Sequence, residues 1–560
     1  MPNIQQPINL QKENEDLKSE IKKLKSRKRY GLVWEHKTEQ VAELCKTKLP
    51  VLTEDRDKEI KNDTNKPVNI LIEGDNYHAL SVLNYTHKNK VDVIYIDPPY
   101  NTGAKDWKYN NDYVDREDTF RHSKWISFMQ KRLLLAKGLL SKNGFIICAI
   151  DANELCSLGL LLDEIFQEKN RVGLVTVLHN PKGRNQARFF SENSEFMIVY
   201  ARDINFSNFN EVAISEDVQS SFDQSDENGK FRYEPFMRAR TVWSRENRPK
   251  NWYPIYVSKD LITITSEKHS GYYEVYPITN NGKEMAWKNV KETFDQLNTD
   301  GYFSAIKEGA KIRIYHKYRE QQVLKNVWLE QKYQSEFHGT NILKGILGKN
   351  IFDYPKSLYL VLDILKLTTK SDSTVLDFFA GSGTTGHAVM LLNKEDGGNR
   401  KFIVCTNNEN GICEDVTYPR LKKVIDGHKD YSKITKIPTN LKYYKTDFVD
   451  AEQTDRNKKK LVDKSTEILC LKEDCFEQVK TGQGFKIFKD NRGKYLGVIY
   501  DDSGIELFKK EIQKLDKKII TYIFSLDDSA REEEFEDIKK LVDLKPIPAV
   551  ILNVYKQIFK

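Results

Sequence analysis

The sequence predicts an α/β fold, a doubly wound, Rossmann-like sheet of parallel strands with helices on both faces. Short, mainly apolar runs at 68–75, 91–96 and 374–379 have the length and composition of strands that are buried on both sides. Helical stretches separate successive runs, as the crossovers between parallel strands require. Two of the runs end in proline-rich or glycine-rich loops, at the edge of such a sheet where ligands bind.

Residues 1–60 form the first predicted segment, which is polar and helical. Its apolar residues fall at the a and d positions of a short coiled coil, with Asn14 at an a position. These apolar residues are Leu10, Leu17, Ile21 and Leu24. A coiled coil would make this a dimerisation segment and the chain a homodimer. A solvated helix with one apolar edge explains the same pattern equally well.

Residues 61–204 are expected to alternate strands and helices. The expected elements are strand 68–75, helix 76–88, strand 91–96, helix 121–141, strand 145–150, helix 153–166 and strands 172–178 and 196–200. The first three make a β-α-β unit of a parallel sheet.

The strand at 91–96 ends in Asp97-Pro98-Pro99-Tyr100. Each proline lacks an N–H and has a fixed φ, so the strand ends there in a rigid corner. An exocyclic amino group on a base is a poor nucleophile, because its lone pair is delocalised into the ring. Asp97 and a rigid backbone carbonyl could accept its hydrogen bonds, and Tyr100 could stack on a base that has left its duplex. The alternative is a strand exit with a solvated Asp and a packing Tyr.

The region 346–432 resumes the sheet pattern, with helix 356–367 and strand 374–379 before Asp377-Phe-Phe-Ala-Gly-Ser-Gly-Thr-Thr-Gly386. A helix at 387–392 and a strand at 401–406 follow, and the strand leads to Glu409. The glycines match G-x-G-x-x-G, so a dinucleotide-binding oxidoreductase is a rival interpretation. His387 stands where a P-loop needs Lys, which argues against ATP hydrolysis.

S-adenosylmethionine is favoured over NAD as the ligand of this loop. Asp377 ends the strand, where a carboxylate can meet the cationic amino-acid end of S-adenosylmethionine. The Asp-Pro-Pro-Tyr corner has no role in hydride transfer.

The alternation fails between residues 205 and 345. Residues 229–252 carry seven basic residues against two glutamates, with aromatic residues interleaved. Such residues contact phosphates, read guanine edges and stack on bases, so they are candidate DNA contacts. They are Lys230, Arg232, Arg238, Arg240, Arg245, Arg248 and Lys250. A charged surface over an aromatic core is the alternative.

Residues 433–560 are expected to be a C-terminal α+β domain without recognisable chemistry. The pattern predicts a hairpin around 491–493, a helix near 505–516, a strand at 519–524, an acidic helix at 529–541 and a last strand near 549–554.

Composition sets broad limits on function. Lys and Arg number 89 and Asp and Glu 82, so the net charge is +7, which permits nucleic-acid binding without arguing for it. The seven cysteines include no C-x-x-C pair, so reduced thiols are expected and no metal site. No signal peptide or long apolar run is present, which favours a soluble cytoplasmic protein rather than a membrane protein.

Asp97-Pro-Pro-Tyr100 and Phe379-Ala-Gly-Ser-Gly383 together resemble the catalytic and cofactor motifs of amino-group DNA methyltransferases. The order of catalytic motif, intervening region and cofactor motif is similar to that of the beta class. Ile96-Asp-Pro-Pro-Tyr-Asn-Thr-Gly103 and Tyr30-Gly-Leu-Val-Trp-Glu35 resemble runs in the modification (Mod) subunits of type III restriction–modification systems. The resemblance covers roughly residues 30–430.

This resemblance implies a Rossmann-like S-adenosylmethionine-dependent fold and base-flipping methylation of the adenine amino group in double-stranded DNA. Catalysis would fall to Asp97, Pro98, Pro99 and Tyr100. The cofactor would be held by Asp75, Asp377, Phe379, Gly381, Gly383 and Glu409, with Glu409 on its ribose and Asp75 near its adenine. Residues 205–345 would recognise the target sequence.

The resemblance also implies a partner, a restriction (Res) subunit with ATP-dependent helicase and nuclease activity. Other functions stay open. A stand-alone or type II methyltransferase shares both motifs, and an oxidoreductase or an inactive DNA-binding regulator would share the fold.

Overall fold

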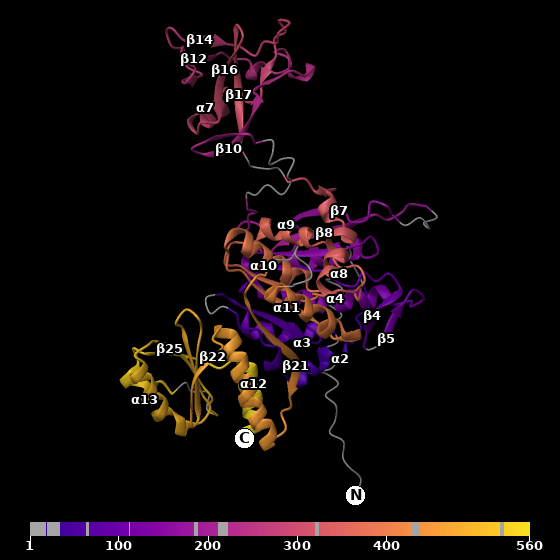
Figure 1. Cartoon of the computed structure of the whole chain (residues 1–560), viewed down its shortest axis with the longest axis vertical. Helices are drawn as coiled ribbons and strands as arrows, with labels where there is room; N and C mark the ends of the chain where they lie inside the picture. Colours follow the sequence, from indigo (N-terminus) through magenta and orange to yellow (C-terminus); the bar gives the residue numbers. More distant parts are fainter. Residues whose placement is uncertain are drawn as a thin grey trace. The chain divides into compact units, whose positions relative to one another are not determined.

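The computed structural model describes residues 18–19, 34–62, 66–110, 112–183, 189–210, 222–319, 324–427, 436–526 and 531–559. The chain divides into two compact units, one of residues 1–208 with 326–560 and one of residues 209–325 (Figure 1). The predicted coiled coil, from Leu10 to Leu24, lies outside the described residues.

The first unit is built on a ten-stranded sheet with the order β1-β21-β2-β20-β19-β3-β6-β8-β7-β18. The strands are β1 (Leu49–Glu54), β21 (Asn440–Val449), β2 (Val68–Glu73), β20 (Lys401–Thr406), β19 (Thr374–Asp377), β3 (Val91–Ile96), β6 (Leu140–Ile150), β8 (Ser194–Ala201), β7 (Arg171–Leu178) and β18 (Val327–Trp328). From β21 to β6 neighbouring strands are parallel, whereas β1 and β8 pair antiparallel with β21 and β6. The predicted α/β class with a doubly wound, Rossmann-like sheet is confirmed.

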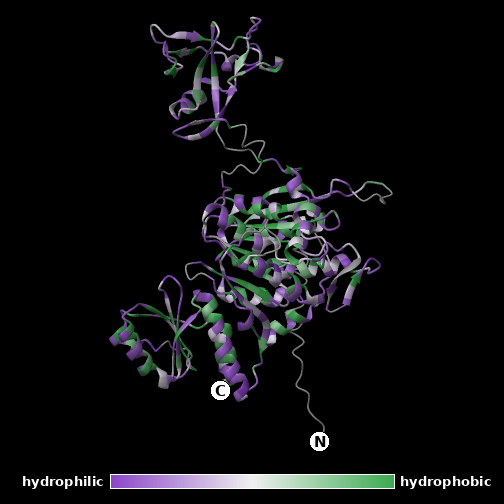
Figure 2. Cartoon of the chain, in the orientation of Figure 1, coloured by the Kyte–Doolittle hydropathy of each residue, from purple (hydrophilic) through white to green (hydrophobic). Residues whose placement is uncertain are grey.

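The central strands are apolar along their whole length because both faces of the sheet are covered. Every residue of β3 except Asp92 is buried, and the main sheet is largely green in the hydropathy view of Figure 2. One group of packed helices comprises α3 (Asn76–Thr86), α4 (Arg121–Leu139) and α5 (Leu155–Phe166). A second comprises α9 (Leu358–Thr368), α10 (Thr384–Asp396) and α11 (Tyr418–Asp426).

The strand order reverses between β3 and β19. The chain leaves β3 through α4 toward β6, and it leaves β19 through α10 toward β20, on the opposite side. Right-handed crossovers therefore put α4 and α10 on opposite faces of the sheet. The diverging connections leave a crevice beyond the carboxyl ends of β3 and β19, which is where such sheets bind ligands.

The C-terminal region begins inside this sheet. The expected boundary at residue 433 precedes β21, which pairs with β1 and β2. Helix α12 (Asp455–Glu473) packs on β1 and α3. It leads to a five-stranded sheet of β22 (Glu477–Gly482), β23 (Phe485–Lys489), β24 (Tyr495–Ile499), β25 (Ile519–Ile523) and β26 (Val542–Lys545).

Two predictions for this region are wrong. The expected strand at 549–554 is helix α14 (Ala549–Phe559), which buries Ile551, Val554, Tyr555 and Ile558 against α12 and its surroundings. This three-to-four spacing is helical, and a short apolar run does not reveal it. The expected acidic helix at 529–541 is a 3-10 helix (Glu532–Ile538). The hairpin at 491–493 and the helix α13 (Ile505–Leu515) are confirmed.

The second unit contains a four-stranded sheet in the order β16-β17-β10-β9 and a small three-stranded sheet. The larger sheet consists of β9 (Gln224–Asp226), β10 (Gly229–Pro235), β16 (Phe303–Glu308) and β17 (Lys311–Arg319). Helix α7 (Lys291–Thr299) packs over an aromatic core of Phe236, Trp287, Phe294 and Phe303.

No helix within the described ranges is both long and apolar enough to cross a membrane.

Candidate active site

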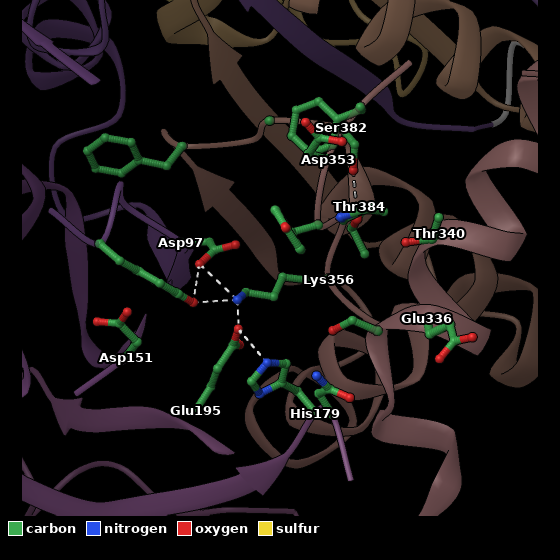
Figure 3. Close-up of a pocket in the computed structure, with 18 of the residues that line it drawn as sticks. Asp97, Asp151, His179, Glu195, Glu336, Thr340, Asp353, Lys356, Ser382 and Thr384 are labelled. Atoms are coloured by element: carbon green, nitrogen blue, oxygen red, sulfur yellow. Dashed lines mark hydrogen bonds and ion pairs between the residues drawn. The ribbon is translucent and has the colours of Figure 1, made fainter. Parts of the chain in front are cut away.

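A cavity of about 830 Å³ lies beyond the carboxyl ends of β3 and β19. Its lining brings together the two motifs of the sequence analysis. Asp97, Pro98, Pro99 and Tyr100 follow β3, Asp377 is the last residue of β19, and Phe379 and Gly381 come after it. The two groups are far apart in the chain and meet because β3 and β19 are neighbours in the sheet (Figure 3).

The Asp-Pro-Pro-Tyr corner is held by α4 and by the residue before α5. The indole Nε1 of Trp125 donates a hydrogen bond to the Pro99 carbonyl at 2.7 Å. Asn101, with a left-handed φ of 58°, is buried and donates from Nδ2 to Glu154 Oε1 at 2.5 Å. Since the Pro99 carbonyl is engaged, a backbone acceptor for a substrate amino group would be the Pro98 carbonyl.

Beside this corner lies a cluster of charges. Lys356 Nζ is 3.3 Å from Asp97 Oδ1 and 2.5 Å from Glu195 Oε2, and His179 Nε2 is 3.8 Å from Glu195 Oε1. The Tyr100 hydroxyl donates to Asp97 Oδ1 at 2.8 Å and accepts a hydrogen bond from Lys356. Figure 3 shows Lys356 between the two carboxylates.

Lys356, Glu195 and His179 were not among the site residues that the sequence motifs predict. Lys356 precedes α9, and Glu195 lies at the start of β8. Because β8 is antiparallel to β6, its start lies at the same edge as the carboxyl end of β3. In the sequence, Glu195 stands out only as a charged residue at the start of an apolar strand. That pattern does not show in which direction the strand runs in the sheet.

The charges in this cluster oppose one another. Burial raises the pKa of Asp97 above its usual value, and the Lys356 ammonium only partly offsets this effect. Burial also acts on Glu195, but Lys356 is closer to it and holds the pKa of Glu195 below its usual range. The two carboxylates raise the pKa of Lys356, so it stays an ammonium. Of the two carboxylates in this cluster, Asp97 is therefore the one that is protonated first as the pH falls.

Asp377 is a second buried carboxyl group at the cavity. Its Oδ1 accepts the Phe379 N–H at 2.9 Å and its Oδ2 accepts the Thr385 hydroxyl at 2.5 Å. Burial raises the pKa of Asp377 to about 7, with a smaller contribution from the negative charge of Asp97 and with the two hydrogen bonds opposing. Bringing a positive charge into this part of the cavity would stabilise the ionised form.

The glycine-rich loop needs its glycines for different reasons. Gly381 lines the cavity with a φ of 47°, and a Cβ there would lie 3.2 Å from Phe352 Cζ. Gly383, with a φ of 78°, precedes α10 but does not line the cavity. A Cβ on Gly386 would lie 2.8 Å from Leu421 Cδ2, so this glycine allows α10 to pack closely on α11.

The cavity has the charge expected of a site for a cation. Seven carboxylates line it, against two lysines and one histidine. The carboxylates are Asp97, Asp151, Glu192, Glu195, Glu336, Asp353 and Asp377. Together with Gly381, whose missing side chain leaves its backbone bare at the cavity wall, this donor set fits a ligand that carries positive charge and approaches the backbone closely.

Asp75 and Glu409 do not line this cavity. Asp75 caps α3 by accepting the Tyr77 N–H at 2.7 Å, and its other oxygen lies 3.4 Å from Arg132. Glu409 pairs with Lys108 at 2.6 Å. Asp75 follows β2 and Glu409 follows β20. These two strands are parallel neighbours, so the two residues lie at the same carboxyl edge of the sheet as the cavity.

The seven basic residues between 230 and 250 lie in the second unit. Several have protein partners: Arg232 pairs with Glu234 and Arg245 with Glu284, each at 2.9 Å. Arg248 lies over the Trp243 ring at 4.7 Å. The aromatic residues of this stretch divide between the core, which contains Phe236, and partly exposed positions.

A sheet with parallel central strands and a ligand-sized cavity at its switch point places this chain in the Rossmann-like α/β class. The family model described as DNA methylase matches residues 91–418, which include both motifs. The chain belongs to this DNA methylase family.

Three relatives illustrate the similarity. The EcoPI Mod subunit of a type III restriction–modification enzyme from Escherichia phage P1 is 33% identical over 69% of this chain and 64% of its own length. The type II methyltransferase M.KpnI from Klebsiella pneumoniae is 33% identical over 64% of this chain and 88% of its own. The StyLTI Mod subunit from Salmonella typhimurium is 34% identical over 60% and 52%. The chain thus spans less than two thirds of these Mod subunits.

Among solved structures, PvuII DNA methyltransferase (cytosine-N4-specific) covers 67% of this chain and 93% of its own, with a TM-score of 0.35 and 10% identity. The M1.HpyAVI–SAM complex covers 63% and 98%, with a TM-score of 0.28 and 14% identity.

Proposed function

We propose that this chain is a site-specific DNA methyltransferase that transfers a methyl group from S-adenosylmethionine to the exocyclic amino group of adenine in duplex DNA. The observation that carries the proposal is the single cavity lined by both Asp97 and the Gly381 loop. An acceptor for an amino group and a site for a cationic ligand therefore lie within reach of one another.

In this proposal Asp97 and the Pro98 carbonyl accept hydrogen bonds from the amino group and localise its lone pair on nitrogen. The Tyr100 ring stacks on the flipped base, while its hydroxyl holds Asp97. Rigid Pro98 and Pro99 keep the acceptors in place. As the new N–C bond formed, the S–CH3 bond of the cofactor would break and S-adenosylhomocysteine would leave, and Asp97 could receive the proton that the nitrogen loses.

S-adenosylmethionine would supply the activated methyl group. The acidic lining and the left-handed Gly381 support its binding, with Asp377, Phe379, Gly381 and Gly383 around its methionine part. Glu409 on the ribose and Asp75 near the adenine remain proposals, and they require the ligand to extend along the edge toward β20 and β2.

Double-stranded DNA is the proposed substrate, and the region 205–345 is proposed to recognise its sequence. The second compact unit, residues 209–325, lies within this region. Lys230, Arg232, Arg238, Arg240, Arg245, Arg248 and Lys250 are the proposed DNA contacts. Their phosphate contacts would offset the cost of extruding a base, which is about a few kcal/mol.

We further propose that the chain works in the cytoplasm as a homodimeric Mod subunit with a Res partner that uses ATP. The similarity to the EcoPI and StyLTI Mod subunits supports this. The similarity to a type II methyltransferase over 88% of that protein supports a stand-alone enzyme as the second candidate.

The test is to express the chain in a bacterium without DNA methylation and to map modified bases by sequencing, with Asp97→Ala as the inactive control. Methylated adenine within one sequence motif is expected. Methylated cytosine would contradict the adenine assignment, and no modification at all would contradict the enzyme. Incubating the pure protein with DNA, ATP and magnesium should give no cutting, and site-specific cutting would contradict the Mod assignment.

A further inference from the structure

Lys356 is a lysine buried between two carboxylates at the proposed catalytic corner. Its side chain is only 8% exposed, and its ammonium contacts Glu195, Asp97 and the Tyr100 hydroxyl. Burying an ammonium is costly unless it is paired, so these contacts are what keep Lys356 in the cavity wall. Asp97 and Tyr100 have roles in the proposed reaction, whereas Lys356 and Glu195 have none assigned.

The contacts converge on one oxygen of Asp97. The Tyr100 hydroxyl donates to Oδ1 at 2.8 Å, and Lys356 Nζ lies 3.3 Å from the same oxygen. In Figure 3 the dashed lines that reach Asp97 end on this one oxygen. An acceptor that must localise a lone pair needs a fixed direction, and a carboxylate held through one oxygen presents the other in a fixed direction.

We propose that Lys356 is a positioning residue for methyl transfer. Anchored by Glu195, it fixes Asp97 through Oδ1 and keeps Oδ2 as the acceptor for the amino group of the substrate base. This inference rests on the proposed function and deepens it. Lys356 acts through Asp97 and does not itself contact the base.

The charges around Asp97 predict how the pH dependence of methyl transfer should change when Lys356 or Glu195 is replaced. The groups facing Asp97 are Tyr95 from β3, Tyr100 from the corner, Glu195 from β8, Asp377 at the end of β19 and Lys356 before α9, with His179 behind Glu195. The negative charge of Glu195 raises the pKa of Asp97, and the positive charge of Lys356 lowers it. Because a protonated Asp97 is a poorer acceptor, removing Lys356 and neutralising Glu195 should shift the pH dependence in opposite directions.

A lysine that merely fastens α9 to the sheet would not produce this signature. The chain offers a matched control, because Lys332 also forms an ion pair with α9, at 2.7 Å from Asp363, and does not line the cavity. Lys332→Met therefore removes a comparable ion pair without touching Asp97.

The experiment measures single-turnover transfer of labelled methyl groups from S-adenosylmethionine to DNA as a function of pH. Lys356→Met should slow transfer about 10²-fold at neutral pH and move the acid limb up by about one pH unit. Lys356→Arg should recover part of the rate. Glu195→Gln should move the acid limb down, Lys332→Met should keep the wild-type profile, and calorimetric cofactor affinity should change little in Lys356→Met.

Unshifted profiles, or shifts in the same direction for Lys356→Met and Glu195→Gln, would overturn the role of Lys356. Should Lys356→Met fail to fold, the nearly isosteric Glu195→Gln decides alone, since an unmoved acid limb contradicts the inference. A wild-type protein that transfers no label to any DNA would contradict the proposed function instead, which keeps the two failures distinct.

Discussion

The raised pKa of Asp377 should make binding of the proposed cofactor depend on pH, and one substitution should abolish this dependence. Burial raises the pKa of Asp377 to about 7, so the carboxyl group is partly protonated near neutrality. A cationic ligand favours the carboxylate, and its apparent affinity is then scaled by the ionised fraction. The affinity for the cationic ligand should therefore rise with pH near neutrality, because only the ionised Asp377 carboxylate attracts its positive charge.

The magnitude follows from this value. With a pKa of about 7, the ionised fraction is about 0.09 at about pH 6 and about 0.5 at about pH 7, so affinity for S-adenosylmethionine should rise about fivefold. The ammonium of the ligand stays mostly protonated below about pH 7, so it contributes little to this change. Asp377→Asn cannot ionise and should lose most of the rise.

Isothermal titration calorimetry of the wild type and of Asp377→Asn at both pH values is the assay. Asp363→Asn is the matched control, because Asp363 is also buried, accepts the Tyr333 hydroxyl at 3.0 Å and does not line the cavity. This control should keep the wild-type dependence. A flat wild-type affinity, or a full fivefold rise that persists in Asp377→Asn, would refute the assignment of Asp377 to the cation site.

Three other predictions follow from the site and the second unit. Asp97→Ala should reduce methyl transfer about 10²–10⁴-fold and leave calorimetric cofactor affinity nearly intact, because the proposed role of Asp97 is to bind the base and not the cofactor. Gly381→Val should block cofactor binding, since a side chain at a φ of 47° is strained and its Cβ would lie 3.2 Å from Phe352. Combining Arg238→Ala with Arg240→Ala should weaken DNA binding in filter-binding titrations and lower the salt slope of log K by about 0.9 for each phosphate that the protein no longer neutralises.

Each of these predictions has a contradicting outcome, and the loop variant also has a matched control. Near-wild-type turnover by the Asp97 variant would exclude its role. Gly397→Val is the control for the loop, because Gly397 has a φ of 73° with open space around its Cβ position, and equal cofactor losses in both variants would mean that strain alone matters. An unchanged salt slope in the double arginine variant would place the phosphate contacts elsewhere.

The local pattern of the sequence determined the central strands and both motifs. The apolar runs at β2, β3, β19 and β20 are strands because a strand covered on both faces is apolar throughout, which short-range composition reveals. Asp97 and Gly381 were predicted because the prolines beside one and the left-handed backbone of the other have sequence signatures.

The same reasoning failed where tertiary context decides. The apolar run in α14 has a strand's length, and only its packing against α12 selects a helix. Likewise β21 continues the main sheet because β1 and β2 offer it two edges, far away in sequence. In both cases the structure of the segment depends on its partner: α14 packs on α12, and β21 pairs with β1 and β2.

The charge cluster is the clearest example of what only tertiary structure determines. Lys356 and Glu195 are ordinary charged residues in the sequence, at the start of a helix and of a strand. They meet Asp97 because β8 runs antiparallel to β6 and α9 starts beside the carboxyl end of β3. Strand direction and the pairing of distant charges depend on long-range contacts, for which local composition carries no signal.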